Sequence, residues 1–468
     1  MTLPATDPTL PADEGPADEG PADEGPADEG PAEEGLVEGD RVELTVGAPA
    51  HGGHCVARLG GPHGRVVFVR HALPGERVTA EITELHKGYL RADAVKIHEP
   101  SPDRVAPPCR FAHPGGCGGC DLQHVASDAQ LRWKTAVVRE QLRRMAGLTP
   151  EDQILETVRV ETLPTATARP GPDGAERLLG WRSRVRYAVD AAGRPGLLQH
   201  RSHQVVAIDR CRIAHPAIQE LDLLDREWPT TDALEVVAST GGDVAVVARP
   251  AGGGALPPDD PAETPALGAG DRILLDGPAE VTEFAAGRRW SVPPDAFWQV
   301  HPAAAETLTA TVVDLLRPAA GEVAWDLYGG AGLFAAALAQ HTRARTVVVE
   351  SSPAGVAAAR NNLADLPVEV VAARVDTALS RRRITGPVDL VVLDPPRSGA
   401  GAKVVRAIVA AGPRAVAYVA CDPVALARDV ATFRALGWEL AELRAFDCFP
   451  MTQHVECVAL LRPLGGTP

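Results

Sequence analysis

The chain has 468 residues, of which 45% are hydrophobic and 23% charged, together with 45 Gly and 42 Pro. This composition is that of a globular protein and excludes a fibrous or wholly disordered one. No stretch approaches the roughly 18 consecutive apolar residues that a membrane-spanning helix needs, and the N-terminus has neither the basic nor the apolar region of a secretory signal. We therefore expect a cytoplasmic protein with no membrane partner and, at this length, about three domains.

The net charge of −16 comes mostly from the N-terminus. Residues 1–40 contain thirteen acidic side chains and no basic one, which leaves 46 basic against 49 acidic side chains in the rest of the chain. Within this segment, residues 11–35 repeat PADEG four times and then PAEEG. Such a repeat cannot offset the conformational entropy lost on ordering. We interpret residues 1–40 as a disordered acidic tail, and the nearly neutral remainder leaves a nucleic-acid partner open.

Residues 41–105 contain short β-rich runs separated by glycine and proline turns. The runs are RVELTV, RVVFV, RVTAEITE and YLRADAVKI. Several short strands in so short a span predict a small closed or nearly closed β-barrel. This stretch resembles a TRAM domain, an OB-like module that binds RNA, and a purely structural barrel is the alternative.

Residues 106–290 have mixed character and predict an α+β central domain. Apolar positions at helical spacing and a glycine stop predict a helix over residues 132–148. After it, the strand-like run LLGWRSRVRYAVD places three arginines on one face beside two aromatic side chains: Arg182, Arg184, Arg186, Trp181 and Tyr187. An exposed face of this kind suits phosphate contacts and base stacking, and a charged edge strand protected against pairing is the alternative. Residues 249–270, rich in Gly and Pro, predict a surface insertion.

Over residues 291–468 apolar strands alternate with Ala-rich helical stretches. The strands are VAWDLY, RTVVVE, VEVVAA, VDLVVLD and RAVAYVA. This alternation predicts an α/β domain with a largely parallel sheet. The nearly continuous β-branched runs indicate strands that are buried on both faces.

Three motifs lie at the ends of these strands. The first, WDLYGGAGLF at residues 325–334, runs from a strand through glycines into a helix, which lets the backbone approach a ligand. The next strand ends in Glu350, 24 residues after Asp326, where an acid can bind ribose hydroxyls. The third motif is DPPR, from Asp394 to Arg397. Because strand ends at one sheet edge gather in space, these elements predict one crevice for an adenosine-containing cofactor.

Two further segments fall at the same edge. Cys421, followed by Asp422 and a proline, ends the strand RAVAYVA, and the segment FPMTQHVE ends in Glu456 just before the last strand. Each has an ordinary interpretation, because free cysteines are usually buried packing residues and an acid beside a strand is commonly a solvated end. Because both segments lie at the sheet edge where the cofactor is expected, we predict instead that Cys421 and Glu456 face the crevice.

Together, the motifs DLYGGAG, DPPR, CDP and HVE resemble those of the RNA 5-methyluridine methyltransferases, class I S-adenosylmethionine enzymes that act on tRNA or 23S rRNA. The resemblance extends over nearly the whole chain after residue 40. It implies a TRAM-like barrel, a central domain and a Rossmann-like class I catalytic domain, in that order. It also implies Cys421 as the nucleophile and Glu456 as the general base. The cofactor-binding residues are then Gln299, Tyr328, Gly329, Gly332, Glu350, Asp376 and Asp394.

Four positions depart from the family's pattern. Gly330 stands where many members have Cys, and three other residues stand where Asn is usual: His301, Leu333 and Asp422. The Asn missing at position 333 removes one polar contact with the cofactor.

The implied chemistry accounts for these residue types. C5 of uracil is a weak nucleophile, and a thiolate that adds to C6 converts the ring to an enolate whose C5 can attack a methyl sulfonium. A cysteine suits this step because its pKa of about 8.5 can be lowered by its surroundings. A base must then remove the C5 proton, which Glu456 can do if burial raises its pKa towards the working pH. The target base must leave its stack to reach a thiol inside a crevice.

Four of the eight cysteines form a spaced set, C-x7-C-x2-C and one far downstream: Cys109, Cys117, Cys120 and Cys211. A CxxC pair in a cytoplasmic chain favours a metal over a disulfide, and four thiolates serve zinc or an iron–sulfur cluster. His113 and His124 are close enough in sequence to be zinc ligands. The resemblance implies a [4Fe–4S] cluster, because a subset of the family holds one with this three-plus-one arrangement. The remaining cysteines, apart from Cys421, we take as packing residues: Cys55, Cys448 and Cys457.

We therefore expect a monomeric, S-adenosylmethionine-dependent RNA uridine-C5 methyltransferase whose substrate is a tRNA or 23S rRNA. One alternative is an amino-group methyltransferase acting on adenine N6 or glutamine N5, which prefers an aromatic residue where this chain has Arg397 and needs no Cys421. Another is a non-catalytic RNA-binding or redox-sensing protein that uses the barrel and the cysteine cluster. A nicotinamide oxidoreductase is the least expected, because no acid/base pair of a substrate domain accompanies the glycine turn.

Overall fold

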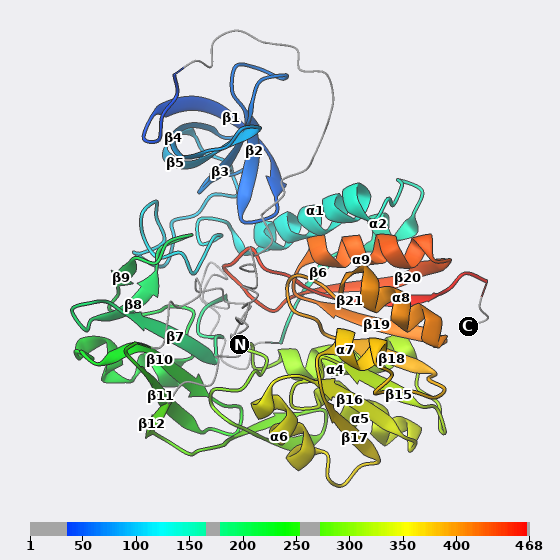
Figure 1. Cartoon of the computed structure of the whole chain (residues 1–468). Coiled ribbons are helices and arrows are strands. Elements are labelled where there is room, and N and C mark those ends of the chain that lie inside the picture. The colour runs from blue at the N-terminus through cyan, green and yellow to red at the C-terminus, as the bar shows by residue number, and fades with distance from the viewer. Residues whose placement is uncertain (1–34, 165–177, 253–271, 466–468) are drawn as a thin grey trace, which may run out of the picture.

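The computed structural model describes residues 35–164, 178–252 and 272–465. Most of the predicted acidic tail and of the predicted surface insertion lies outside these ranges. Figure 1 shows a small barrel at the top, the sheet of the central region at the lower left and a larger sheet with its helices at the right. Of the helices in the described part, none is long and apolar enough to cross a membrane.

The N-terminal barrel is closed and has five strands. They are β1 (Arg41–Ala50), β2 (His54–Arg58), β3 (Val66–Arg70), β4 (Arg77–Leu85) and β5 (Tyr89–Glu99). The strand order is β1-β2-β3-β5-β4, and the pairing of β1 with β4 closes the sheet on itself. Alternate apolar side chains such as Val67, Val78 and Leu90 are fully buried in its interior. The barrel predicted from the β-rich runs is confirmed.

The C-terminal part is built on an eight-stranded sheet. Its strands from this part are β15 (Ala324–Leu327), β16 (Thr346–Glu350), β17 (Val368–Ala372), β18 (Leu390–Leu393), β19 (Ala415–Ala420), β20 (Trp438–Asp447) and β21 (Glu456–Pro463). The strands β17-β16-β15-β18-β19 are parallel in that order, and β21 and β20 follow in antiparallel pairing. The predicted α/β architecture is confirmed. The sequence analysis missed β20, whose run WELAELRAFD mixes charged and apolar side chains.

Helices cover both faces of this sheet. They are α4 (Ala304–Leu316), α5 (Leu333–Thr342), α6 (Pro353–Asn362), α7 (Val375–Ser380), α8 (Gly401–Ala411) and α9 (Pro423–Ala435). Leu308 of α4 and Leu338 of α5 share one core with the sheet, and Val405 of α8 and Phe433 of α9 share the core on the opposite face. The inner strands are buried on both faces as expected, whereas the edge strand β17 is half exposed. Because the strand order reverses between β15 and β18, a crevice opens at their carboxyl ends.

The central region forms a six-stranded antiparallel sheet in the order β12-β11-β10-β7-β8-β9. Its elements are β7 (Arg184–Val189), β8 (Pro195–Leu198), β9 (Val205–Ala207), α3 (Pro216–Gln219), η2 (Asp222–Asp225), β10 (Thr231–Ala238), β11 (Val244–Pro250) and β12 (Ile273–Asp276), followed by the hairpin β13 (Val281–Ala285) and β14 (Arg288–Val292). This sheet and its short helices have the mixed character that the sequence predicts.

One segment of the central region joins the C-terminal sheet. It contains α1 (Ser127–Met145), α2 (Gln153–Thr157) and β6 (Val160–Thr162). Strand β6 pairs in parallel with β20 and becomes the eighth strand, while α1 packs on α9. The helix predicted over residues 132–148 is confirmed as α1, although it begins and ends earlier.

The exposed basic strand predicted around Arg184 is wrong. Strand β7 lies inside the six-stranded sheet, between β10 and β8, so neither the RNA-facing interpretation nor the edge-strand alternative holds. The three arginines and two aromatic residues of this run are all buried: Trp181, Arg182, Arg184, Arg186 and Tyr187. Arg184 is ion-paired with Glu283 of β13, with 3.3 Å between Nη2 and Oε1. Alternation in a sequence shows that side chains share a face, but not that another segment covers this face.

Candidate active site

A cavity of about 370 Å³ lies at the carboxyl ends of the parallel strands. Its walls come from the glycine turn after β15, the DPPR segment after β18, the end of β19 and the start of β21. This is the crevice expected where the strand order reverses. It brings together six of the residues predicted from the sequence: Gln299, Tyr328, Glu350, Asp394, Cys421 and Glu456.

The turn after β15 is shaped by left-handed backbone conformations. Tyr328 has a φ of 64° and Gly332 a φ of 93°. A Cβ atom at Gly332 would lie 2.4 Å from Cδ1 of Leu363, so only glycine fits where α5 begins. The amide of Gly330 donates a hydrogen bond to the Glu350 carboxylate at 2.9 Å, and the two serine amides that follow Glu350 donate to it as well. The acid at the end of β16 is thus held against the glycine turn.

Gln299 reaches the cavity on a loop after β14 that Arg184 holds in place. The Arg184 guanidinium donates to the carbonyls of Pro294 and Ala296, each at 3.0 Å. The hydroxyl of Ser183 donates to the carbonyl of Val300 at 2.8 Å. The run that was mispredicted as an RNA-binding face therefore positions a wall of the cavity.

Three carboxyl groups lie at or near the cavity: Asp394 and Glu456 line it, and Asp326 is fully buried against Gly329 of the glycine turn. Burial raises the pKa of Asp326 to about 8 and that of Asp394 to about 7. Burial, and then the charge of Asp394, raise the pKa of Glu456 well above its usual range, while Arg397 opposes this effect. Asp326 accepts a hydrogen bond from the Ala335 amide at 2.8 Å, which fixes the first turn of α5. Burial therefore makes each of these groups hold its proton to a higher pH than it would in water.

Cys421 lines the cavity from the end of β19. Burial raises the pKa of its thiol well above the usual value, and the charges of Glu456 and Asp394 raise it further, whereas Arg397 lowers it. The Arg397 guanidinium donates a hydrogen bond to this sulfur. Surroundings that lower this pKa would suit a nucleophile. The cleft raises it, because burial and the carboxyl groups outweigh the guanidinium.

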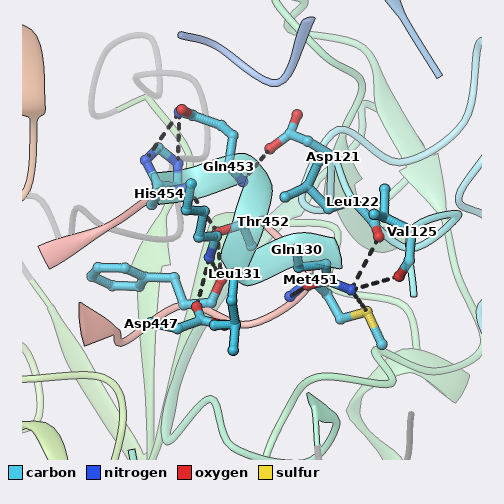
Figure 2. Close-up of polar contacts among 12 residues, drawn as sticks. Asp121, Leu122, Val125, Gln130, Leu131, Asp447, Met451, Thr452, Gln453 and His454 are labelled. Carbon is cyan, nitrogen blue, oxygen red and sulfur yellow. Dashed lines mark hydrogen bonds and ion pairs between the residues drawn. The ribbon is translucent and has the colours of Figure 1, made fainter. Parts of the chain in front are cut away.

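The loop between β20 and β21 backs the cavity and is held by α1. The buried Lys134 of α1 is ion-paired with Asp447, with 2.6 Å between Nζ and Oδ1, and donates to the carbonyl of Phe449 at 3.0 Å. Gln130 of the same helix accepts a hydrogen bond from the amide of Met451 at 3.0 Å (Figure 2). Phe449 itself lines the cavity. The sequence analysis missed these roles, and the available signal was a Lys and a Gln at core-facing positions of an amphipathic helix.

Arg397 also lines the cavity, although it is not among the site residues predicted from the sequence. It belongs to the DPPR motif, whose arginine served there only to distinguish one class of methyltransferase from another. The signal for its role lay in the position of the motif, since a cation at a sheet edge that carries several acids can balance their charge.

Comparison with known proteins assigns this arrangement to a family. A TRAM domain model matches residues 36–95, a methyltransferase small domain model matches residues 304–418, and a tRNA (uracil-5-)-methyltransferase model matches residues 383–463. An uncharacterized RNA methyltransferase of Streptomyces avermitilis is 48% identical over 436 residues, which are 91% of this chain and 99% of that protein. The chain belongs to this family of RNA methyltransferases.

Other relatives and one solved structure agree. Uncharacterized RNA methyltransferases of Streptomyces coelicolor and Bifidobacterium longum are 47% and 37% identical, over 91% and 90% of this chain and 93% and 96% of theirs. The tRNA (uracil-54, C5)-methyltransferase of Pyrococcus abyssi, in complex with S-adenosyl-L-homocysteine, matches with a TM-score of 0.63 and 22% identity over 89% of this chain and 100% of that one. The RNA methyltransferase thus has the predicted class I fold with an N-terminal TRAM domain.

S-adenosylmethionine is the methyl donor of this methyltransferase class, and the cavity fits it. Its volume lies within the roughly 300–1,000 Å³ of small-molecule sites. The glycine turn leaves room for a ligand against the backbone, and the carboxylate of Glu350 and the amide of Gln299 provide polar groups at the walls. Pro395 and Ala331 supply apolar surface. A small number of placed polar groups in an apolar cavity is what such a ligand requires.

The remaining predicted cofactor residues lie around this cavity. Gly329 lines a smaller, adjoining cavity together with Gln299 and Tyr328. Gly332 and Asp376 are not among the lining residues of either. Asp376 forms an ion pair with the arginine two residues before it. Burial, and then the charge of Asp376, raise the pKa of Tyr328 to about 12. The cofactor roles of these residues stay predictions.

The four spaced cysteines of the methyltransferase line one small cavity of about 20 Å³: Cys109, Cys117, Cys120 and Cys211. Burial raises the pKa of Cys120 well above its usual value, and the charges of Cys117 and Cys211 add to this effect, so the thiols lie within electrostatic reach of one another. Neither His113 nor His124 is among the lining residues. Within the described ranges, however, no group of three or more Cys, His, Asp or Glu side chains stands close enough to hold a metal ion. The four thiols are residue types that bind metal ions, but in this structure they do not stand close enough together to hold one.

Proposed function

We propose that this RNA methyltransferase transfers a methyl group from S-adenosylmethionine to C5 of a uridine in a tRNA or 23S rRNA, through a covalent bond between Cys421 and C6 of the base. The observation that carries the proposal is the pairing, in one cavity beside the glycine turn, of a thiol with a carboxyl group whose pKa is raised. An amino-group methyltransferase needs neither group.

Cys421 acts first. Its thiolate adds to C6, a sulfur–carbon bond forms, and the electron pair of the C5–C6 double bond moves towards C5. The guanidinium of Arg397, which hydrogen-bonds the thiol, stabilises the thiolate against the neighbouring carboxyl groups. S-adenosylmethionine, when bound, supplies an electrophilic methyl group that C5 can take up.

Glu456 acts second. After methylation C5 carries both a methyl group and a proton, and the ionised carboxyl group of Glu456 removes this proton. The electron pair of the C5–H bond re-forms the C5–C6 double bond, and the sulfur–carbon bond breaks to release Cys421. Burial and Asp394 raise the pKa of Glu456, which makes it a stronger base than a carboxylate in water.

We further propose that Gln299, Tyr328, Glu350 and Asp394 contact the cofactor, because all four line the same cavity. The buried carboxyl group of Asp394 can donate as well as accept a hydrogen bond near neutral pH, since its pKa is raised to about 7. The glycines at 329 and 332 shape the turn on which the cofactor lies.

The small cysteine cavity is proposed to hold a [4Fe–4S] cluster, with zinc as the alternative. Four thiols around one space are ligands that serve either metal centre. The cavity joins the segment 109–120 to Cys211 in the central region, so a metal centre there would tie these segments together. We assign it a structural role.

The substitution Cys421→Ala tests the proposed reaction. We expect methyl transfer to RNA to fall by about a thousandfold or more, because the nucleophile is lost, while binding of S-adenosylmethionine is retained. Transfer of a radiolabelled methyl group to RNA from a strain that lacks the gene measures the first, and calorimetry measures the second. Cys55→Ala, which removes a buried thiol from the barrel, is the matched control. Turnover of Cys421→Ala at the control's rate would reject the mechanism, and the nucleoside missing from the deletion strain identifies the target.

A further inference from the structure

The turn between β1 and β2 of the barrel lies against the residues around Cys421. Nε2 of His51 lies 3.3 Å from Oδ2 of Asp422, the residue after Cys421. The amide of Gly52 donates a hydrogen bond to Oε1 of Gln453 at 3.3 Å. At Gly53, with a φ of 75°, a Cβ atom would lie 2.7 Å from Cβ of Asp121, so this approach requires glycine.

The carboxylate of Asp422 serves two purposes at once. Its Oδ1 accepts hydrogen bonds from the amides of Val424 and Ala425, both at 2.8 Å, and so caps the N-terminus of α9. Its Oδ2 faces His51. An asparagine caps a helix as well as an aspartate does, so the cap alone does not require a charged residue here. The contact with His51 is the interaction in this structure that depends on the charge of Asp422.

A second chain of contacts runs from the same turn to the same thiol. Gln453, which accepts from the barrel, donates from Nε2 to Nδ1 of the His454 ring at 3.1 Å (Figure 2). The same ring nitrogen lies 3.4 Å from Nη2 of Arg397. Arg397 in turn donates a hydrogen bond to Cys421. Both routes from the barrel therefore end at the thiol.

The charges that face Cys421 come from four residues on three segments. Glu456 at the start of β21, Asp394 after β18 and Asp422 before α9 disfavour its thiolate, and Arg397 favours it. Burial raises the pKa of Asp422, but the hydrogen bond and charge of His51 and the two amides of α9 outweigh it and leave that pKa below its usual value. The Asp422 carboxyl group is therefore ionised beside the thiol, and the imidazole ring of His51 faces it.

We propose that His51 is a positioning residue for the catalytic thiol: carried by the barrel, its ring contacts the Asp422 carboxylate and so weakens the effect of that charge on the thiolate of Cys421. The barrel thereby acts on the reactivity of the nucleophile. This inference rests on the proposed function only in naming Cys421 as the nucleophile.

The test is the reactivity of the thiol itself, in the full-length protein. The rate at which iodoacetamide alkylates Cys421 is followed against pH by mass spectrometry of its peptide, because the thiolate is the reacting form. We expect His51→Asn to slow the reaction at pH 7.5 by about two- to fivefold, the scale of a partly exposed polar contact whose side chains are 34% and 19% exposed. Asp422→Asn keeps the helix cap and speeds the reaction. In the Asp422→Asn background, His51→Asn has no further effect, since no carboxylate is left for the ring to contact.

Two outcomes would overturn the inference. Equal slowing by His51→Asn in both backgrounds would mean that the barrel turn acts by packing, and no slowing in either would mean that it does not act on the thiol. His63→Asn, at an exposed position elsewhere in the barrel, is the matched control and leaves the rate unchanged. Because alkylation requires neither RNA nor cofactor, this result stays separate from that of the Cys421→Ala methylation assay. In that assay His51→Asn lowers kcat and leaves the KM for S-adenosylmethionine unchanged.

Discussion

Two sites in this methyltransferase hold half-buried cysteines, and they differ in what surrounds the sulfur. Cys421 lines a cavity of about 370 Å³ with a guanidinium beside it, whereas Cys120 lines one of about 20 Å³ among other thiols. Burial raises the pKa of both. Burial therefore does not distinguish the proposed nucleophile from the proposed metal ligand. Space for a nucleobase and a nearby cation mark the first, and additional thiols mark the second.

For the cavity that contains Cys421, the substitution with the largest expected effect is Glu456→Gln. We expect turnover to fall by about 10²- to 10⁴-fold, because the C5 proton is no longer removed. The covalent bond between Cys421 and RNA then persists, and a slowly migrating protein–RNA band accumulates on a denaturing gel. Glu442→Gln, at an exposed position of β20, serves as the control and turns over normally. Loss of turnover without the band would mean that Glu456 acts before the adduct forms.

The thiol cavity is tested by Cys120→Ser. If it holds a metal centre, anaerobically purified wild-type protein contains iron or zinc by elemental analysis, and Cys120→Ser loses most of it because one of four ligands is gone. Methyl transfer per folded molecule falls far less than in the cleft variants. Cys55→Ser retains the metal, since that thiol lies in the barrel interior. A wild-type protein purified without air and without either metal would reject the metal centre.

The smallest expected effect is on the pH dependence of the free energy of unfolding, through the buried carboxyl group of Asp326. The pKa of Asp326 is about 8 in the folded protein and about 4 in an unfolded chain. The folded state therefore binds this proton more tightly, and the stability gained at low pH is lost as the pH rises from about 4 to 8. We expect the free energy of unfolding to decrease by up to a few kcal/mol between pH 5 and 8.

The substitution Asp326→Asn should make that decrease smaller, because the amide cannot ionise while it still accepts from the Ala335 amide. Urea unfolding at pH 5, 6.5 and 8 measures the change, with the exposed Asp225→Asn as the control. Identical slopes in the wild type and Asp326→Asn would show that Asp326 is already ionised in the folded state.

Prediction from the sequence worked best where local patterns are strong. The β-rich runs after residue 40 form the closed barrel, and the apolar strands after residue 291 form the sheet in which the motif residues meet at one edge. It failed at β7, because alternation shows which side chains share a face but not what covers that face. It also missed β6, a three-residue strand whose pairing with β20 is a long-range contact.

The sequence by itself determined the order of the parts and the family and predicted the residue types of the proposed reaction, because these depend on composition, periodicity and motifs that are local in the chain. Only the tertiary structure decided the electrostatics. That Arg397 reaches Cys421, that Asp394 raises the pKa of Glu456, and that His51 faces Asp422 depend on groups distant in sequence but adjacent in space. Coulombic interactions and desolvation depend on distance and burial, and neither can be read from the order of residues.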